Sequence, residues 1–245
     1  MGALGKIAMD DPILLQGPPV LGAIVAILAA IDAGFLARRI GTVRLRAYNK
    51  WYFYGLILVL VLSAVGIWET HTYRSFSVPS AGMVPALLPG DRFFVLKTAY
   101  RNAEPQSGDI IVAAKNDGFF VKRVVGVAGD RVQVIAGRLF INGAQIEREA
   151  LGDFAFGDVH HTLYLEILPN GRRYRIVERS DHEFLDDTTE VTVPAGALFV
   201  MGDNRDNSMD SRVADFGLIP VGTVEGKAVF LTWARDWRRI GSKLE

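Results

Sequence analysis

The chain has 245 residues, with 27 basic and 27 acidic side chains, so its formal net charge at pH 7 is zero. This balance gives no sign of the basic face that a nucleic-acid partner requires. Cysteine is absent, which excludes disulfides, zinc–thiolate sites and a cysteine nucleophile. Hydrophobic residues make up 50% of the chain and the mean hydropathy is +0.21, which fits a membrane-tethered protein.

The first apolar stretch follows a mixed segment, residues 1–17, that lacks the basic start of a cleavable signal peptide. Residues 18–38 predict a transmembrane helix, because a rise of about 1.5 Å per residue lets them cross a bilayer core of roughly 30 Å. Asp32 interrupts this stretch. Its carboxylate either has a partner inside a helix pair, or lies near enough to the end to reach headgroups, or is protonated. A re-entrant or peripheral helix also fits.

The second apolar stretch, residues 51–68, carries no charge and has aromatic side chains at both ends, which predicts a spanning helix. Residues 39–50 between the two stretches are basic, without an acidic side chain, so this loop is expected in the cytoplasm. The N-terminus and everything after Glu69 are then expected outside the cytoplasm.

Residues 69–245 are expected to form one extracytoplasmic domain of short strands. Apolar and polar residues alternate in residues 163–178 on both sides of Asn170-Gly171. This pattern predicts a hairpin, because Asn170 and Gly171 both tolerate positive φ. The other expected strands are β-branched or aromatic runs bounded by turn residues: 92–99, 109–115, 119–127, 130–143, 190–203 and VEGKAVFLTWA within 214–235. This pattern is typical of a mainly β fold, either a barrel or a coiled sandwich.

The stretch from Phe76 to Asp91 reads FSVPSAGMVPALLPGD, with three prolines and two glycines. Proline fixes φ and removes a hydrogen-bond donor, so neither a helix nor a central strand is expected. We predict an ordered, extended loop that presents short side chains to another chain.

Lys122 lies among apolar residues in FFVKRVVGVAGD. Loss of hydration lowers the pKa of a lysine and allows its neutral amine to act as a base. Strand alternation should turn Lys122 and Arg123 to opposite faces, one toward the interior. From these residues alone, a solvated pair of cations on a strand is the other interpretation.

Residues 202–212, GDNRDNSMDSR, are dense in Asp, Asn and Ser, which predicts a turn-rich loop with local hydrogen bonds from side chains to the backbone. A solvated or calcium-binding loop is the alternative. The spacing of an EF-hand is absent, since the required glycine and the closing glutamate are missing.

These three segments resemble, in order, three sequence boxes of the bacterial type I signal peptidases, or leader peptidases. The family's nucleophile box runs Pro-Ser-Gly-Ser-Met-x-Pro-Thr-Leu, and five positions of this chain match it: Pro79, Ser80, Met83, Pro85 and Leu87. KRVVGVAGD resembles the lysine box, Lys-Arg-x-x-Gly-x-Pro-Gly-Asp, with Ala128 in place of the proline. GDNRDNSMDSR matches the last box at every specified position.

The resemblance implies a role for each matched position. Lys122 would be the general base, and Ser208 would orient its amine. Ser80 would supply a hydroxyl to the oxyanion hole, next to the backbone N–H at position 82. The supporting positions would be Asp203 and Met83, together with an ion pair between Asp210 and Arg212.

The family fold implied by the resemblance is mainly β: two N-terminal transmembrane helices precede a β-barrel-like catalytic domain. An inserted β-subdomain would occupy residues 131–198. His160, His161 and His182 fall in this insertion without a fourth partner for a metal, so surface histidines and no metal site are expected. No cofactor is implied, and the oligomeric state is left open.

Gly82 stands where the family has its nucleophilic serine, with Ala81 and Ala86 replacing the usual glycine and threonine. The family activity is a membrane-bound Ser/Lys endopeptidase acting on signal peptides of exported preproteins at the bacterial inner membrane. Cleavage is expected to be lost or much reduced here. The open alternatives are a signal-peptide-binding or accessory protein, residual cleavage through Ser80 or a water, and a tethered structural β-module. Ser80 would lie about 6–7 Å from the nucleophile position on an extended strand.

Overall fold

The structure, a computed structural model, describes residues 52, 55–60, 63, 72–115 and 118–244. The predicted helix at 18–38 and the segments 1–17 and 39–50 lie outside these residues; within 51–68, residues 55–60 are helical. Across the described ranges, no helix has both the length and the apolar character needed to cross a membrane. Arg74–Glu245 and Asp11–Tyr73 belong to two different compact units.

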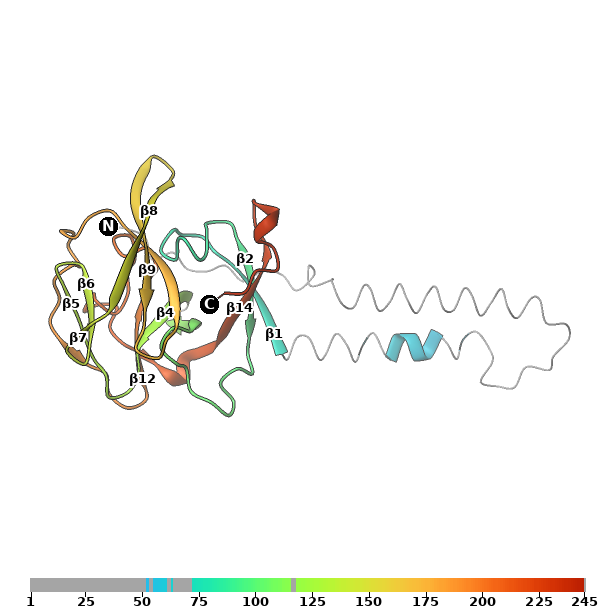
Figure 1. Ribbon diagram of the computed structural model, residues 1–245. Helices are drawn as coiled ribbons and strands as arrows, with labels where there is room; N and C mark the ends of the chain where they lie inside the picture. Colours follow the sequence, from blue (N-terminus) through green and yellow to red (C-terminus); the bar gives the residue numbers. More distant parts are fainter. Residues whose placement is uncertain (1–51, 53–54, 61–62, 64–71, 116–117, 245) are drawn as a thin grey trace, which may run out of the picture. The chain divides into compact units, whose positions relative to one another are not determined.

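The largest element of the described domain is a seven-stranded sheet (Figure 1). Each hydrogen-bonded pair for which the register is known is antiparallel. The strand order is β1 (Tyr73–Ser77), β2 (Arg92–Leu96), β14 (Val224–Trp233), β3 (Ile110–Lys115), β4 (Gly118–Gly126), β12 (Ala197–Met201) and β13 (Ile219–Pro220).

Two smaller sheets come from residues 131–192, within the range expected to form an insertion. One has the order β10 (Arg173–Glu178), β9 (Val159–Ile167) and β8 (Glu147–Phe156). The other has the order β11 (Val191–Thr192), β5 (Arg131–Ile135), β6 (Arg138–Ile141) and β7 (Ala144–Gln145). Short 3₁₀ turns, η3 (Val221–Thr223) and η4 (Trp237–Arg239), flank β14.

Both faces of the seven-stranded sheet are covered, because β3 sends alternate side chains into two cores. Ile110 and Val112 lie in one core, and Ile111 and Ala113 lie in the other. Each residue of β4 shares a face with its partner across β3. Lys122 pairs with Ile111 and Arg123 with Ile110, so the two cations face opposite sides, as the alternation predicts.

The expectation that only one of these cations points inward is wrong. Arg123 is 1% exposed, and the Lys122 side chain is partly buried on the other face. The physical reason is that this sheet is packed on both sides, whereas the alternation argument assumed one solvated face.

The hairpin predicted at 163–178 is confirmed, since β9 and β10 pair in antiparallel register around the turn at Asn170-Gly171. The expected strand at 130–143 is instead two strands, because Ala136 and Gly137 take positive φ values of 45° and 71° and turn the chain. The sequence did not indicate β8, whose residues are mostly exposed.

Two further expectations are corrected. The segment 76–91 is not extended: after β1 it runs through consecutive turns over residues 80–87. His160 and His182 are exposed as expected, but His161 is buried in β9. Alternation along β9 turns His161 away from its exposed neighbour and toward the interior.

Candidate active site

The turn that carries Gly82 is fixed by its own apolar residues. Met83 and Leu87 are buried in the core that also contains Phe76 of β1. Within the turn, Val84 N donates to Ala81 O at 3.2 Å and Leu87 N to Met83 O at 2.9 Å. The two buried anchors and these local bonds set the position of the buried Gly82 backbone between them.

Asn204 holds this turn from the loop that follows β12. Its backbone N donates to Gly82 O at 3.1 Å, and its Nδ2 donates to Ala81 O at 3.2 Å. The sequence placed Asn204 in the last matched box, residues 202–212, but did not indicate its hydrogen-bond partners. A loop asparagine has many possible local partners, so only the fold identifies Ala81 and Gly82 as its acceptors.

Lys122 reaches the same place from β4. Its Nζ donates to Ser208 Oγ at 3.0 Å. Burial lowers the pKa of the Lys122 amine, although the nearby Asp210 carboxylate favours the charged form and opposes the shift. The structure therefore brings Lys122 and Ser208 together in an environment that favours the neutral amine.

Gly82 faces this pair. A Cβ built on Gly82 would lie 3.4 Å from Lys122 Nζ, 3.8 Å from Ser208 Oγ and 3.3 Å from the carbonyl oxygen of Asn207. Gly82 is not among the glycines with positive φ, so its backbone also accepts other residue types. Position 82 is thus next to the amine, and it has no side chain to present to it.

Ser80 lies at the start of the turn and is exposed. In the part of the chain that the structure describes, Ser80 makes no hydrogen bond to Lys122, and the Gly82 N–H donates to no other residue. Both donors are therefore available to a bound ligand.

Asp210 and Arg212 form an ion pair near the Lys122 amine. Arg212 Nε donates to Asp210 Oδ1 at 2.9 Å, and Gly202 N donates to Asp210 Oδ2 at 2.9 Å. Burial alone would raise the pKa of Asp210, but the Arg212 guanidinium and the hydrogen bonds hold it below its usual value. The charged carboxylate fixes the loop that carries Ser208.

Asp203 pairs with Arg123 rather than with Lys122. Arg123 Nε and Nη2 donate to the two Asp203 oxygens at 2.7 and 2.8 Å, and both side chains are 1% exposed. Arg123 Nη1 also donates to Gly108 O at 2.8 Å. This buried pair ties the start of the box loop to β4.

A second buried pair, missed by sequence reasoning, joins the box loop to the insertion. Arg205 forms an ion pair with Glu166 of β9, and Tyr174 of β10 donates to Glu166 Oε2 at 2.7 Å. The Arg123 guanidinium lies 4.3 Å from the Tyr174 ring centroid. No local pattern marks Glu166, because its partner is 39 residues away in the sequence.

At Gly202 the backbone packs directly against Ser208 and Gly82. A Cβ at this position would overlap Ser208 Oγ and Gly82 O. We expect Gly202→Ala to lower the free energy of unfolding by about 1–3 kcal/mol, because a well-packed site must move to admit the methyl group. Equilibrium denaturation measures this loss.

The matched control for this change is Gly222→Ala, at a glycine with no atom near the added Cβ. It should change the free energy of unfolding by no more than about 0.5 kcal/mol. Equal effects of the two substitutions would contradict the close packing of Gly202 against Ser208.

The lowered pKa of Lys122 predicts a pH dependence of stability. Between that lowered pKa and the usual value of 10.5, the unfolded chain binds more protons at this residue than the folded chain. The contribution of Lys122 to stability therefore increases as pH rises through this window. We expect Lys122→Met to remove this increase in unfolding free energies measured from neutral to alkaline pH. Lys243→Met, at an exposed lysine, is the control, and equal slopes in both variants would contradict the assignment.

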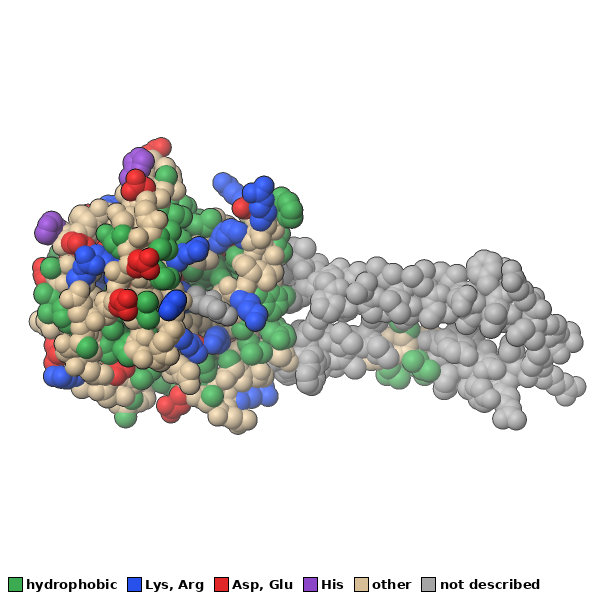
Figure 2. Space-filling model, viewed as in Figure 1, with side chains coloured by type: hydrophobic (Ala, Val, Ile, Leu, Met, Phe, Trp, Pro, Cys, Tyr) green, Lys and Arg blue, Asp and Glu red, His purple; other side chains and the backbone are tan. Residues whose placement is uncertain are grey.

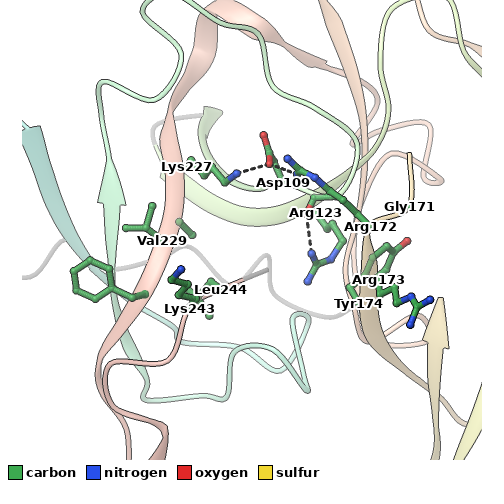
Figure 3. Close-up of a pocket in the computed structure, with 13 residues that line it drawn as sticks. Asp109, Arg123, Gly171, Arg172, Arg173, Tyr174, Lys227, Val229, Lys243 and Leu244 are labelled. Carbon is green, nitrogen blue, oxygen red and sulfur yellow. Dashed lines mark hydrogen bonds and ion pairs between the residues drawn. The ribbon is translucent and has the colours of Figure 1, made fainter. Parts of the chain in front are cut away.

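A cavity of about 620 Å³ lies away from this site, and neither Lys122, Ser208 nor Gly82 lines it. Figure 3 shows Lys227 and Arg172 pointing toward Asp109 in its wall, and Lys227 Nζ lies 2.6 Å from Asp109 Oδ1. Burial alone would raise the pKa of Asp109, but the bonds from Lys227 and Arg172 lower it. Asp109 thus holds two cations, and these ion pairs connect the residue before β3, the residue before β10 and β14.

Comparison with known proteins identifies the family of this chain. The family described as "Signal peptidase, peptidase S26" matches residues 50–233. The chain belongs to this signal peptidase family. The match includes all three segments that form the site, the turn at Gly82, β4 and the loop after β12.

The signal peptidases of two Pseudomonas species agree with this assignment. Signal peptidase I of Pseudomonas aeruginosa is 33% identical over 76% of this chain and 72% of its own length. Signal peptidase I of Pseudomonas fluorescens is 34% identical over 76% of this chain and 72% of its own length. A crystal structure of a signal peptidase I from Enterococcus faecalis aligns over 51% of this chain and 96% of that chain. The sequence identity is 26% and the TM-score is 0.33.

Proposed function

We propose that this protein is a membrane-tethered signal peptidase homologue that binds the signal peptides of exported preproteins without forming an acyl-enzyme at position 82. One observation carries the proposal. The backbone of residue 82 lies beside Lys122, and a Cβ built on it would lie 3.4 Å from the amine, but the glycine bears no hydroxyl. Acylation at this position requires an oxygen that glycine lacks.

We propose that the other groups around position 82 supply the rest of a peptide-binding and acid–base site. Lys122 is the proposed base, with Ser208 holding its amine. The Gly82 N–H and the Ser80 hydroxyl are the proposed donors to a substrate carbonyl, as in an oxyanion hole. Asp210, Arg212, Asp203 and Met83 are proposed to keep these groups in place through the contacts described above.

Direct replacement of the nucleophile by Ser80 finds no support in the geometry. Ser80 precedes Gly82 on a turn, is exposed and has no bond to Lys122 within the described ranges. A nucleophile of this kind is activated by a hydrogen bond to its base, so Ser80 would first have to move to reach Lys122.

The proposed location is the bacterial inner membrane, with the catalytic-type domain outside the cytoplasm. The sequence supports it through the uncharged segment 51–68 and the basic loop before it. The end of β14 and the segment after it add exposed Trp233 and Trp237, near exposed arginines in the sequence. Figure 2 shows Lys and Arg gathered with hydrophobic side chains on this projection, a combination that suits a headgroup layer.

A binding experiment tests the proposal. The full-length protein in detergent is titrated with a fluorescent signal peptide that carries small residues at the first and third positions before the cleavage site. The matched peptide has leucine at both positions. We expect the small-residue peptide to bind at least about 10-fold more tightly, a difference of about 1.4 kcal/mol. Equal binding of both peptides, or of neither, supports a structural β-module instead.

A further inference from the structure

The space next to Gly82 is lined by polar atoms from three separate positions. Measured from the Cβ point of Gly82, Asn207 O lies at 3.3 Å, Lys122 Nζ at 3.4 Å and Ser208 Oγ at 3.8 Å. A methyl group there would meet three polar atoms and gain no hydrogen bond. The Cβ point is about 1.5 Å from the Gly82 Cα, too close for a water. A water oxygen farther out along this direction approaches the three polar atoms toward the usual hydrogen-bond range of about 2.7–3.2 Å.

The three neighbours also suit the bonding capacity of water. A buried water typically makes about three hydrogen bonds to otherwise unused polar groups. It can donate to the Asn207 carbonyl and to the neutral amine of Lys122, and it can accept from the Ser208 hydroxyl. Lys122 Nζ already donates one N–H to Ser208 Oγ, which leaves its lone pair for the water. One lone pair of the water then remains for attack.

We infer that a water bound at Gly82, activated by Lys122, hydrolyses a bound peptide directly and without a covalent intermediate. The inference rests on the proposed function, because the peptide must bind with its carbonyl at the Gly82 N–H. The further activity is general-base hydrolysis of an extended peptide or ester.

The reaction balances without a cofactor. The water oxygen forms a bond to the scissile carbonyl carbon while one water proton moves to Lys122 Nζ. The carbonyl oxygen becomes an oxyanion held by the Gly82 N–H and Ser80. The C–N bond then breaks, the proton on Lys122 goes to the leaving amine, and a carboxylic acid remains.

The surroundings of Lys122 agree with this assignment. In the folded domain its amine contacts Ser208 Oγ, and Asp210 and Arg212 are the charged groups that act on it most strongly, followed by Asp203. Asp210 and Asp203 are each bound to an arginine, so neither is free to take the water proton in place of Lys122.

The test uses a depsipeptide, a signal peptide with an ester in place of the scissile amide, because its hydrolysis is fast enough to measure at low catalytic power. For the full-length protein in detergent, we expect acceleration of about 10³-fold over the uncatalysed reaction, the level that sites without their nucleophile retain. Gly82→Ala puts a methyl group into the space that the water needs and should reduce this rate at least about 10-fold, a loss of about 1.4 kcal/mol of transition-state stabilisation. Gly222→Ala, in open space, should keep the rate.

Added hydroxylamine separates the two chemical routes. An acyl-enzyme transfers its acyl group to hydroxylamine and gives a hydroxamate, whereas direct attack by water gives the carboxylic acid. Hydroxylamine also attacks the depsipeptide ester directly, so the hydroxamate formed without protein is subtracted, and we expect no protein-dependent hydroxamate. A protein-dependent hydroxamate, an ester mapped to Ser80 or Ser208, or a rate unchanged in Gly82→Ala overturns the inference. Binding of the small-residue peptide without any acceleration overturns the inference and leaves the proposed function standing. Absence of binding overturns the proposed function itself.

Discussion

Gly82→Ser is expected to create an active endopeptidase. The serine Cβ would lie 3.4 Å from Lys122 Nζ, so its hydroxyl can reach hydrogen-bond distance of the amine with a small rotation. The neighbouring Asn207 carbonyl, at 3.3 Å, has to yield by a few tenths of an ångström. Because loss of the nucleophile in subtilisin, an unrelated serine protease, costs about 10⁶ in kcat, we expect cleavage of a preprotein to rise at least about 10³-fold.

The measurement is a gel or mass-spectrometric assay of a preprotein with a small-x-small site, with the protein in detergent. Gly82→Ser combined with Lys122→Ala should fall at least to the level of the unchanged chain, because the new hydroxyl then has no base. Gly222→Ser introduces the same side chain in open space and should have no effect. An inactive but folded Gly82→Ser variant that still binds the peptide would show that the turn does not present residue 82 to the scissile bond.

Arg123→Met is expected to be the most destabilising single change in the described domain outside the apolar cores. Arg123 and Asp203 are each 1% exposed and joined by two hydrogen bonds. Removing one partner leaves a buried, uncompensated charge, which typically costs about 3–5 kcal/mol. Equilibrium unfolding in guanidinium chloride, followed by tryptophan fluorescence, measures this loss as a shift of the midpoint.

Arg131→Met is the matched control, since Arg131 pairs with Glu190 at 3.5 Å with side chains 51% and 40% exposed. A solvated pair of this kind contributes no more than about 1 kcal/mol. In the double variant Arg123→Met with Asp203→Leu, most of the stability should return, because both buried charges are removed together. A double variant as unstable as Arg123→Met alone would mean that the bond of Arg123 to Gly108 or its stacking on Tyr174, and not the charge pair, carries the effect.

Much of the β structure could be predicted because it follows from local patterns. The runs that became β2, β3, β4 and β14 are apolar or β-branched and end at turn residues, and Asn170-Gly171 marked its hairpin. The prediction was wrong where the deciding residue is an ordinary one: Ala136 takes a positive φ and splits one expected strand into two. The mostly exposed strand β8 was not predicted, because its pairing with β9 holds it in the sheet.

The candidate site was predictable in its parts and not in its assembly. The matched boxes indicated Lys122, Ser208 and the Asp210–Arg212 pair, and the structure places them in contact or close by. Asn204 and Glu166 were missed, since a polar residue reveals its partner only when the chain has folded. The extended form expected for residues 76–91 was also wrong, because burial of Met83 and Leu87 turns the segment toward the core.

The sequence by itself determined the chemistry that position 82 lacks: glycine has no hydroxyl in any fold, so an ester at this residue is excluded. It also determined the strands whose apolar and β-branched runs are local properties of the chain. Only the tertiary structure decided that the Gly82 backbone, the Lys122 amine and the Ser208 hydroxyl meet, across a separation of 86 residues between the last two. The physical reason is that burial of Met83 and Leu87, the hydrogen bonds from Asn204 and the buried Arg123–Asp203 pair act between distant segments of the chain. Burial of Lys122 in the same fold lowers the pKa of its amine.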